Sequence, residues 1–417
     1  MGEHVAGTRF HLEEDKRLTI LKVVGIGGAG GNAVNRMVGS GFTGVDFLAV
    51  NTDLQVLRGS AAQQRIQVGQ KLTRGLGSGG DPATGRKAAE ESREVIKETL
   101  QGSDMVFLTC GMGGGTGTGA SPVVASVARE TGALTVGIVT KPFFFEGDQR
   151  IAQADRGIEE LRNQVDTLLI IPNDKLLSIT AENTSLLDAF TMADEVLCNA
   201  TRGISDLITE TGVVNLDFAD VKSVMKNGGD AIMGTGFGKG ENGAEEAARM
   251  AINSPLLDSV SVKGATGILV NITGSKSLAL RQVSKAATIV NKEAGPGAHV
   301  FLGAVISDEM KGDEIRITVI ATGFNAVKPR REERVEEKKE EINFRELLSD
   351  EPAEIRIERL EPAEARHERR EPTEARREKR EPAPEEQEET ILFDNGSIRT
   401  FNTDRLRIPT FVRKQMD

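Results

Sequence analysis

The residues of this 417-residue chain that are best suited to chemistry are glycines and threonines crowded into one short segment. The segment is Gly111–Gly119 (GMGGGTGTG), and it lies between the apolar run Met105–Cys110 and a stretch of helical character. Crowded glycines let backbone N–H groups converge on an anion, and the first turn of a helix adds the positive end of its dipole. The hydroxyls of Thr116 and Thr118 add further donors. The segment is therefore typical of a phosphate cradle rather than of a flexible turn.

A second glycine-rich segment, Gly25–Asn32 (GIGGAGGN), follows the apolar run Thr19–Val24. It satisfies the pattern G-x-G-x-x-G, so a dinucleotide-dependent oxidoreductase is an alternative on this segment alone. Two observations count against that alternative. Such an enzyme has no use for a second, richer glycine segment, and His299 is the one histidine outside stretches that we expect to be disordered. The chain also lacks the G-x-x-x-x-G-K-[ST] and N-K-x-D motifs of other nucleotide-binding proteins.

The elements that must position these segments alternate along the first part of the chain. Glycines come just after the strand candidates, at the edge where open α/β sheets bind their ligands. The expected strands are Thr19–Val24, Asp46–Val50, Met105–Thr109, Ala133–Val139 and Thr167–Ile171, and the expected helices are Asn32–Val38, Ala83–Leu100, Pro122–Glu130 and Gln149–Asn163. We therefore predict an α/β fold with a parallel, doubly wound domain over residues 19–182.

A long amphipathic helix follows, near Thr184–Ile208, and Gly212 ends it, which gives a central helix over residues 183–212. A second, smaller α/β domain is expected over residues 213–325. Its predicted strands lie near Gly267–Thr273, His299–Ser307 and Glu314–Ala321.

The ends of the chain have a different composition. Residues 1–18 are expected to be a disordered extension, and they contain no apolar run that would indicate a signal peptide. Residues 326–399 carry a charged ten-residue repeat, seen as EPAEARHERR and EPTEARREKR, which has proline in every copy and no apolar face. Such a segment cannot build a core, so we predict a disordered linker. Apolar and basic residues return in a C-terminal peptide, 400–417.

The bulk composition excludes several classes of protein. The formal net charge is −11, with no basic block outside the tail, so a dedicated nucleic-acid binder is not expected. Two distant cysteines, Cys110 and Cys198, make neither a disulfide framework nor a metal site and suit a reducing compartment. No apolar run is long enough to span a membrane.

The glycine segments and their neighbours resemble the FtsZ family of the tubulin superfamily, the bacterial cell-division GTPases. GGGTGTG at 113–119 is the superfamily signature, and the similarity extends over about residues 19–325. The other similar blocks are GIGGAGGNAVNRM at 25–37, AVNTD at 49–53, KLTRGLGSGGDPATGRKAAEES at 71–92, VTKPFFFEG at 139–147, IPNDKL at 171–176, NLDFADVKSVM at 215–225 and the tail IPTFVRKQ at 408–415.

The resemblance implies binding of GTP and GDP with Mg²⁺, and hydrolysis of GTP, with no metal site made by the protein alone. It implies head-to-tail self-assembly into filaments of the division ring, in the cytoplasm at mid-cell. Residues 400–417 would bind membrane-tethering and regulatory division proteins, without nucleic acid and without direct membrane insertion. The residues that it implies for nucleotide binding are Gly27, Gly28, Gly31, Asn32, Asp53, Gly77, Gly79, Gly113, Gly114, Gly115, Thr116, Gly117, Thr118, Gly119, Glu146, Arg150, Asn173, Phe190 and Asp194.

Several of these implied roles have a physical reason and an open alternative. Glu146 and Arg150 are four residues apart, so on a helix they share a face and could contact ribose and phosphate, or form a surface ion pair. Asn173 and Asp194 would recognise guanine, because a carboxylate can accept from its N1–H and 2-amino groups. Phe190 lies one turn before Asp194 and could stack on the base or belong to the core.

The implied catalytic residues are Asn215, Asp217 and Asp220, just beyond the long helix. A helix of about 25 residues is nearly 40 Å long, so a single chain could hardly fold them onto its own glycine segments. In the family this loop enters the nucleotide site of the next subunit, where the two carboxylates would polarise the attacking water. Asp217 also precedes an apolar-periodic stretch, so capping of a helix is the alternative role.

Overall fold

The structure is a computed structural model of the whole chain. It describes residues 19–178, 180, 183–210, 212–257, 262–307 and 310–324, together with the backbone of 390–392 and 398–400. The chain divides into two compact units, 1–336 and 337–417, and each is described by itself. The expectations for residues 1–18, and for most of 326–399 and 400–417, lie outside the described residues.

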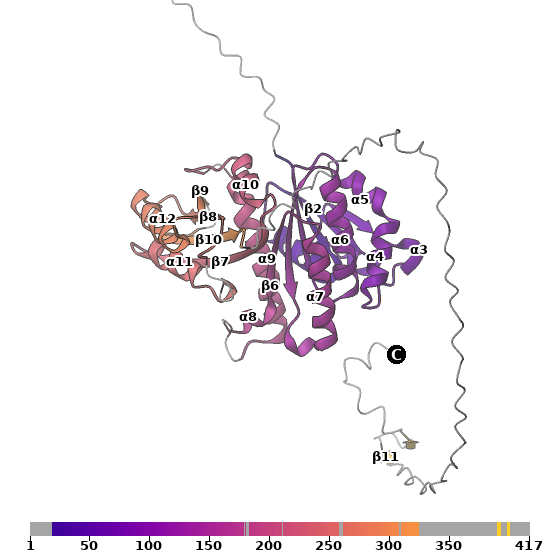
Figure 1. Cartoon of the computed structure of the whole chain (residues 1–417). Helices are drawn as coiled ribbons and strands as arrows, with labels where there is room; N and C mark the ends of the chain where they lie inside the picture. Colours follow the sequence, from indigo (N-terminus) through magenta and orange to yellow (C-terminus); the bar gives the residue numbers. More distant parts are fainter. Residues whose placement is uncertain are drawn as a thin grey trace, which may run out of the picture. The chain divides into compact units, whose positions relative to one another are not determined.

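The first unit is built on one ten-stranded sheet, in the order β3-β2-β1-β4-β5-β6-β7-β10-β8-β9 (Figure 1). The strands are β1 (Leu21–Ile26), β2 (Asp46–Asn51), β3 (Gln64–Gln67), β4 (Met105–Gly111), β5 (Leu134–Lys141), β6 (Thr167–Pro172), β7 (Gly229–Lys239), β8 (Gly267–Gly274), β9 (His299–Ile306) and β10 (Glu314–Thr322). The α-helices are α1 (Gly27–Gly39), α2 (Leu54–Arg58), α3 (Gln70–Thr73), α4 (Pro82–Glu91), α5 (Arg93–Leu100), α6 (Gly115–Glu130), α7 (Asp148–Arg162), α8 (Asn173–Leu177), α9 (Leu186–Thr209), α10 (Phe218–Met225), α11 (Gly243–Ile252) and α12 (Leu280–Ala294).

In the order of the sheet, the strands β3, β2, β1, β4, β5, β6 and β7 all pair parallel to their neighbours. This confirms the predicted doubly wound sheet. β1 pairs with β2 on one side and with β4 on the other, so that Ile26 lies beside both Val50 and Cys110. The strand order therefore reverses between β1 and β4, the kind of position at which open α/β sheets bind their ligands. The order β3-β2-β1-β4-β5-β6 is that of dinucleotide-binding folds, which explains why the first glycine segment matches their motif.

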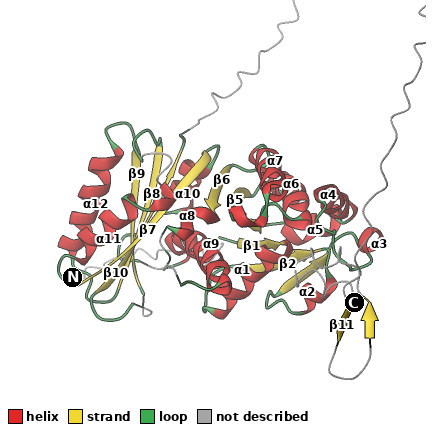
Figure 2. Ribbon diagram, turned by 90° about the horizontal axis from the view of Figure 1, so that it is seen from below, coloured by secondary structure: helices red, strands yellow, loops and turns green. Residues whose placement is uncertain are grey.

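Helices cover both faces of this parallel part (Figure 2). Successive strand residues point to opposite faces, so Val23 belongs to one apolar core and Val24 to the other. The first core is completed by α1 and α9, through residues such as Met37 and Leu197. The second core is completed by α4 to α7. Burial on both faces explains why β4 is largely apolar and buried except at its last residue.

The C-terminal strands form a mixed extension of the same sheet. β10 runs antiparallel to β7 and β8, while β8 and β9 are parallel. One face packs against α11 and α12, and the other packs against α9 and α10. Because α9 contributes to a core shared with the parallel strands, this helix connects the two parts of the sheet.

Strand β7 was not predicted from the sequence, because three glycines interrupt its apolar pattern. Gly234, Gly236 and Gly238 alternate, so they share one face of the strand. A Cβ on any of the three would lie within 2.0 Å of a carbonyl oxygen of α11. The glycines therefore let α11 lie directly on the strand, and the two helices α11 and α12 were missed together with it.

Two helices begin earlier than predicted, inside the glycine segments. α1 starts at Gly27 instead of Asn32, and α6 starts at Gly115 instead of Pro122. Glycine disfavours helix in isolation, but close packing compensates here. A Cβ on Gly119 would lie 1.9 Å from the carbonyl oxygen of Pro82, so glycine lets α6 pack tightly against α4.

The helix predicted over Ala83–Leu100 is divided into α4 and α5 at Ser92. The hydroxyl of Ser92 accepts a hydrogen bond from the backbone N–H of Gly69, at 3.3 Å, and so joins the break to the segment before α3. No helix in the described part of the chain is long and apolar enough to cross a membrane.

In the second unit the structure describes two short strands, β11 (Thr390–Leu392) and β12 (Ile398–Thr400), paired antiparallel. They fall at the end of the segment for which disorder was expected. Their residues are largely β-branched, which favours strands.

Candidate functional site

The starts of helices α1 and α6 meet at the crevice between β1 and β4. Neither helix has a side-chain cap at its N-terminus, where Ile26 and Gly114 are the flanking residues. A Cβ on Gly27 would lie 2.8 Å from the backbone nitrogen of Gly117, so the two starts are in direct contact. The first N–H groups of each helix have no intrahelical acceptor. Two helix dipoles and several unpaired N–H groups thus converge on one place, which is suited to a polyanion.

The glycine segment before α6 is held in place by a hydrogen bond between two of its own residues. The backbone N–H of Gly113 donates to the hydroxyl of Thr118, at 2.8 Å, and Gly113 has a positive φ of 96°. Thr118 is only 2% exposed. The Gly113 N–H is therefore already used, and the remaining donors for an anion are the N–H groups of the first turn of α6.

The glycines of the two segments differ in what surrounds them. A Cβ on Gly28, Gly31 or Gly114 would meet no heavy atom within 4 Å, so the space beside these residues is open. A Cβ on Gly115 would instead lie 2.2 Å from Ser78 Oγ, and one on Gly117 would lie 2.5 Å from a carbonyl oxygen. The open glycines leave room for a ligand, whereas the other two are required for close packing inside the protein.

The segment between β3 and α4 is held over the start of α6. The backbone of Asp53 pairs with that of Leu76, and the N–H of Leu54 donates to the carbonyl of Gly75, at 3.1 Å. The Asp53 side chain caps α2, accepting from two backbone N–H groups at 2.8 and 3.2 Å. Gly77 and Gly79 have positive φ values of 87° and 60°, which let the chain turn sharply there. The segment thus lies beside the start of α6, where Ser78 and Asp81 are close to Gly115.

Asp81 caps α4 at the end of the same segment. Its carboxylate accepts from Thr84 Oγ1 at 2.7 Å and from the N–H groups of Ala83 and Thr84 at 3.0 Å each. The hydrogen bond from the Thr84 side chain, followed by those from the backbone of Ala83 and Thr84, lowers the pKa of Asp81. This carboxylate is therefore committed to the helix start beside the cradle.

Glu146 and Arg150 form the ion pair that their spacing predicted, at 3.0 Å. The side chain of Glu146 is 9% exposed, whereas that of Arg150 is 51% exposed. Glu146 also accepts from the backbone N–H of Phe143, at 2.9 Å. The backbone and Cγ of Arg150 pack against Gly113, so the start of α7 lies against the glycine segment.

Three residues predicted to recognise the base lie on α8 and α9. Asn173 is 5% exposed, and its Oδ1 is buried without a hydrogen-bond partner. Phe190 is 39% exposed and lies edge-on to Phe143, with ring centroids 5.5 Å apart, so it is not a core residue. Burial raises the pKa of Asp194 to about 6, and the nearby Arg36 opposes that rise. A buried acceptor with no partner and a partly desolvated carboxylate suit a ligand rich in N–H donors.

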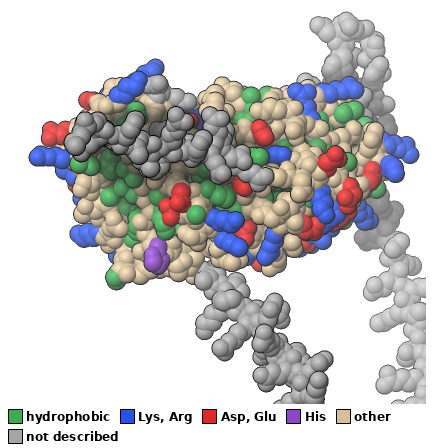
Figure 3. Space-filling model, turned by 90° about the horizontal axis from the view of Figure 1, so that it is seen from above, with side chains coloured by type: hydrophobic (Ala, Val, Ile, Leu, Met, Phe, Trp, Pro, Cys, Tyr) green, Lys and Arg blue, Asp and Glu red, His purple; other side chains and the backbone are tan. Residues whose placement is uncertain are grey.

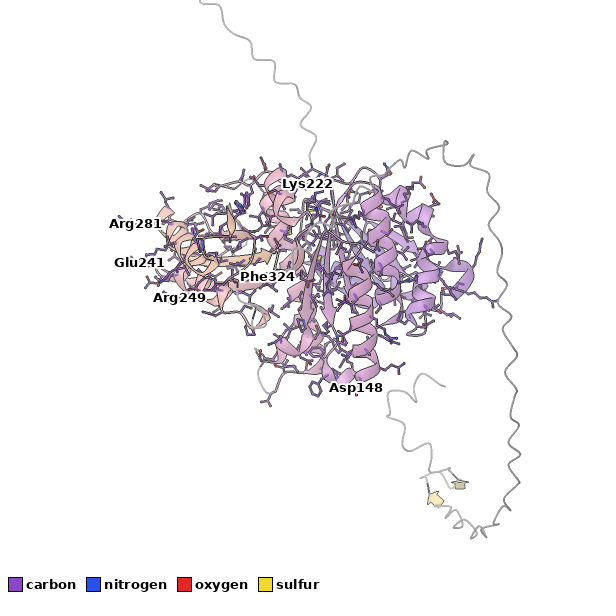
Figure 4. All side chains as sticks on the ribbon, in the orientation of Figure 1. Asp148, Lys222, Glu241, Arg249, Arg281 and Phe324 are labelled. Carbon is purple, nitrogen blue, oxygen red and sulfur yellow. The ribbon has the colours of Figure 1, made fainter. Side chains whose placement is uncertain are left out.

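The predicted catalytic residues lie beyond the far end of α9. This helix has 24 residues, which corresponds to about 36 Å. Asp217 caps α10 by accepting from the N–H of Asp220, at 2.8 Å, and Asn215 accepts from the N–H of Gly212, at 2.6 Å. In Figure 4, Asp148, just after Glu146, and Lys222, just after Asp220, lie on opposite edges of the first unit. Within one chain the structure does not bring these residues together with the glycine segments.

Two hydroxyl residues beside the cradle, Thr52 and Ser78, were not singled out from the sequence. Both meet Thr116: Thr52 Oγ1 is 2.7 Å from Thr116 Oγ1, and Ser78 Oγ is 3.0 Å from it. The only signal in the sequence was their place in two blocks similar to the family, AVNTD and GLGSGG. Single hydroxyl residues have no recognisable pattern until the fold places them together.

The residues around the cradle offer little for a metal ion by themselves. In the residues that the structure describes, no group of three or more His, Cys, Asp or Glu could hold one. Two carboxylates of the neighbouring segments, Asp53 and Asp81, are both occupied as helix caps.

Comparisons with known proteins agree with this geometry. A family model described as the Tubulin/FtsZ family, GTPase domain, matches residues 20–181, and the FtsZ family, C-terminal domain, matches residues 229–325. The chain is 47% identical to FtsZ of M. jannaschii, solved as an empty dimer, with a TM-score of 0.71, covering 74% of this chain and 89% of that one. It shares its fold with CetZ2 from Haloferax volcanii, solved as a GTPγS-bound protofilament, at 21% identity, a TM-score of 0.62, and 73% and 92% coverage.

These matches give no support to the dinucleotide-dependent oxidoreductase. The strand order that this chain shares with dinucleotide-binding folds explains why Gly25–Asn32 matches their motif. The second glycine segment, Gly111–Gly119, is the feature that distinguishes this chain from such an enzyme. The chain belongs to the Tubulin/FtsZ family and carries both the GTPase domain and the FtsZ-type C-terminal domain of that family.

Proposed function

We propose that this chain is a GTP-dependent polymerising GTPase whose head-to-tail filaments form the cell-division ring at mid-cell in the cytoplasm. The observation that carries the proposal is the separation of two half-sites, one at the glycine segments and one at Asp217 and Asp220, by the 24-residue helix α9, which is about 36 Å long. Asp148 and Lys222, which are close in sequence to Glu146 and Asp220, lie on opposite edges of the first unit (Figure 4). Each half-site needs the other, and only a second subunit can supply it.

The nucleotide half-site would hold GTP through groups that the fold leaves open. The triphosphate would accept from the first N–H groups of α1 and α6 and fill the space beside Gly28, Gly31 and Gly114. Hydrogen bonds from several N–H groups to a charged phosphate contribute roughly 1.5–3 kcal/mol each. The remaining residues predicted for phosphate and ribose contacts are Gly27, Asn32, Asp53, Gly77, Gly79, Gly113, Gly115, Thr116, Gly117, Thr118, Gly119, Glu146 and Arg150.

Guanine would be selected at the other end of this half-site. Asp194 would accept from the N1–H and 2-amino groups of guanine, and Asn173 would satisfy its buried Oδ1 at the same base. The exposed ring of Phe190 would stack on the base. Adenine offers no such pair of donors, and leaving buried acceptors unpaired disfavours it strongly.

Mg²⁺ would accompany the nucleotide rather than occupy a site made by the protein alone. It prefers oxygen ligands, keeps several waters, and is usually held through substrate phosphates with one or two carboxylates. Asp81 is one carboxylate residue beside the start of α6, where its backbone approaches Gly115. When bound, the ion would supply positive charge that neutralises the phosphates during hydrolysis.

The catalytic half-site would act on the nucleotide of the neighbouring subunit. Asp217 and Asp220 would polarise the attacking water, and Asn215 would hold the loop through its bond to Gly212. Asp217 has its cap partner in its own chain, yet it remains exposed, so one carboxylate oxygen is still accessible to the next subunit.

The two opposite ends of the chain expose apolar side chains that an interface would bury. Near the catalytic loop, Val213 is 74% exposed and Val214 is 42% exposed. Figure 3 shows the face that holds α10, where hydrophobic side chains are grouped on the half that carries the C-terminal elements. At the nucleotide end, Phe144 and Leu187 are 65% and 75% exposed. Different surfaces at the two ends suit a heterologous contact, which builds open filaments.

Assembly followed by light scattering tests the proposal. GTP with Mg²⁺ should give scattering that rises above a threshold protein concentration, while GDP and ATP at the same Mg²⁺ should give none. Equal scattering with GTP and GDP would contradict it.

The tail has a separate proposed role, as the peptide that binds membrane-tethering and regulatory division proteins. A chain that ends at about residue 398 should assemble with GTP like the full chain but fail to concentrate at the division site in cells. Loss of assembly in solution would contradict this division of roles.

A further inference from the structure

Glu146 lies at the end of a single 3₁₀ turn, η1 (Phe144–Glu146), between β5 and α7. Phe144 and Phe145 in this turn are 65% and 49% exposed, so the turn projects from the surface of the chain. The first N–H groups of a helical turn have no acceptor within it. The position of the turn, and with it the position of Glu146, therefore depends on contacts with its surroundings.

The first of these contacts is apolar. Phe143 directly precedes the turn and is 0% exposed. Its ring stacks on that of Phe145, with centroids 5.0 Å apart, and meets the ring of Phe190 from α9 edge-on at 5.5 Å. The buried ring fixes the turn at one point, about which the turn could still rotate.

The second contact is a hydrogen bond from a neighbouring element. The backbone N–H of Phe144 donates to Oδ1 of Asp174, in the first turn of α8, at 2.9 Å. Among the hydrogen bonds of the described residues, this is the one that joins the backbone of the turn to a side chain outside it. The N–H of Phe143 is accepted by Glu146 of the turn itself. Asp174 is therefore the second point at which the turn is fixed.

The same helix start carries the residue that faces the base in the proposed complex. Asn173 precedes Asp174 and has a buried Oδ1 without a partner, whereas Asp174 is exposed and bonded to the turn. In the turn, one carboxylate oxygen of Glu146 accepts from Phe143 and the other pairs with Arg150. Each of these oxygens has a further lone pair, which a ligand hydroxyl could use. The start of α8 thus sets the distance between an acceptor for the base and an acceptor for a hydroxyl.

We propose that Asp174 is a positioning residue for the ribose of the nucleotide. It holds the turn so that Glu146 accepts from the ribose hydroxyls while Asn173 meets the base. Asp174 acts through Glu146 and makes no contact with the nucleotide itself. Hydrogen bonds weaken steeply when their geometry is poor, so a loosened turn loses them. This inference rests on the proposed GTP-binding function and deepens it, because it identifies what fixes the ribose acceptor relative to the base.

The test measures the affinity of the full-length chain for GDP and for 2′,3′-dideoxy-GDP by titration calorimetry, at one Mg²⁺ concentration. The ratio of the two affinities reports the contribution of the ribose hydroxyls. The unaltered chain should prefer GDP by roughly 10- to 100-fold, the scale of hydrogen bonding to a charged group. Asp174→Ala should lower this ratio by about 3- to 10-fold, the scale of the one hydrogen bond that it removes. Asp174→Asn should preserve the ratio, because its amide oxygen still accepts from Phe144 although the charge at the start of α8 is gone.

Two further variants show whether the effect passes through Glu146. Glu146→Ala should bring the ratio close to one, and adding Asp174→Ala to it should lower the ratio no further. Asp166 provides a matched control at the opposite end of β6, where its carboxylate accepts from the backbone N–H of Thr135, also at 2.9 Å. Asp166→Ala removes the same kind of bond and should leave the ratio unchanged. Circular dichroism of each variant shows that it is folded.

The outcomes separate the inference from the function on which it rests. A variant that only loosens the fold weakens both nucleotides by the same factor. If Asp174→Ala leaves the ratio unchanged, or if Asp174→Asn lowers it as much as Asp174→Ala does, the inference is wrong. If the unaltered chain binds GDP and its dideoxy form equally, Glu146 accepts from no ribose hydroxyl and the inference is wrong, although the nucleotide binds. If the unaltered chain binds neither GDP nor GTP, the proposed function itself is wrong.

Discussion

The two ends of helix α9 present opposite ways of building half of an active site. At its N-terminal end the site is made mostly of backbone: two uncapped helix starts in contact, glycines that leave open space, and hydroxyls already bonded to one another. At its C-terminal end the site is made of exposed side chains, Asn215 and Asp217, bonded only to their own loop. The first half is shaped in advance for a ligand. The second half is exposed, and in the proposed filament it would act on the nucleotide of the next subunit.

The largest expected effect concerns Asp217, whose carboxylate could act on water through its charge or serve only as the cap of α10. Asp217→Asn and Asp217→Ser keep a side-chain acceptor for the N–H of Asp220 and remove the charge, whereas Asp217→Ala removes both. If the carboxylate acts on water, all three should lower the turnover number by about 10²–10⁴, with GTP affinity unchanged. Steady-state phosphate release and equilibrium binding measure the two quantities. If only Asp217→Ala loses activity, the residue is a cap and the comparison between the two ends fails.

A mixture of two defective chains tests whether the halves belong to different subunits. Asp220→Ala retains an intact cradle, and Gly114→Val retains an intact catalytic loop, while each alone should be nearly inactive. Gly115 is unsuitable for this purpose, because a Cβ there would collide with Ser78 and Asp81 inside the protein. Mixed together, the two should hydrolyse GTP at their hybrid interface faster than the sum of the separate rates. Purely additive rates, with wild-type activity per subunit independent of concentration, would mean that one chain holds the whole site.

The glycines of the cradle should divide into binding and packing residues. Gly114→Val places a side chain in open space, so it should lower GTP affinity by at least about 100-fold through the loss of several hydrogen bonds to phosphate, with little change in stability. Gly119→Ala places a Cβ 1.9 Å from the carbonyl of Pro82, so it should cost about 1–3 kcal/mol of stability. Nucleotide titration and thermal unfolding distinguish the two. Equal effects of both variants on affinity would remove the distinction between open and packed glycines.

The sequence predicted the parallel strands and the two glycine segments because both leave regular patterns. β4 is largely apolar, and the crowded glycines follow it directly. Strand β7 was missed because Gly234, Gly236 and Gly238 serve contact with α11, and such a contact exists only after folding. Thr52 and Ser78 were not singled out for a similar reason. The separation of Asp217 from the cradle was predicted from helix length alone, since the rise per residue is fixed.

The smallest expected effect concerns pH and the nucleotide end. Burial raises the pKa of Asp194 to about 6, and only the ionised carboxylate can accept from both guanine donors. The folded pKa lies above the usual value for Asp, so the free protein takes up a proton as the pH falls through about 6. GTP affinity should therefore be nearly constant above pH 7 and about tenfold lower at pH 5, because most free molecules are then protonated.

Calorimetry in two buffers with different ionisation enthalpies measures this exchange directly. Below pH 6 GTP binding should release a proton, because the guanine donors favour the ionised form of Asp194. Asp194→Asn should bind GTP more weakly at every pH and should abolish the release. The catalytic end provides the contrast, since Asp217→Asn should leave both the affinity and the proton release unchanged. If Asp194→Asn retained the full pH dependence, another group would be responsible, and Asp194 would have no part in reading the base.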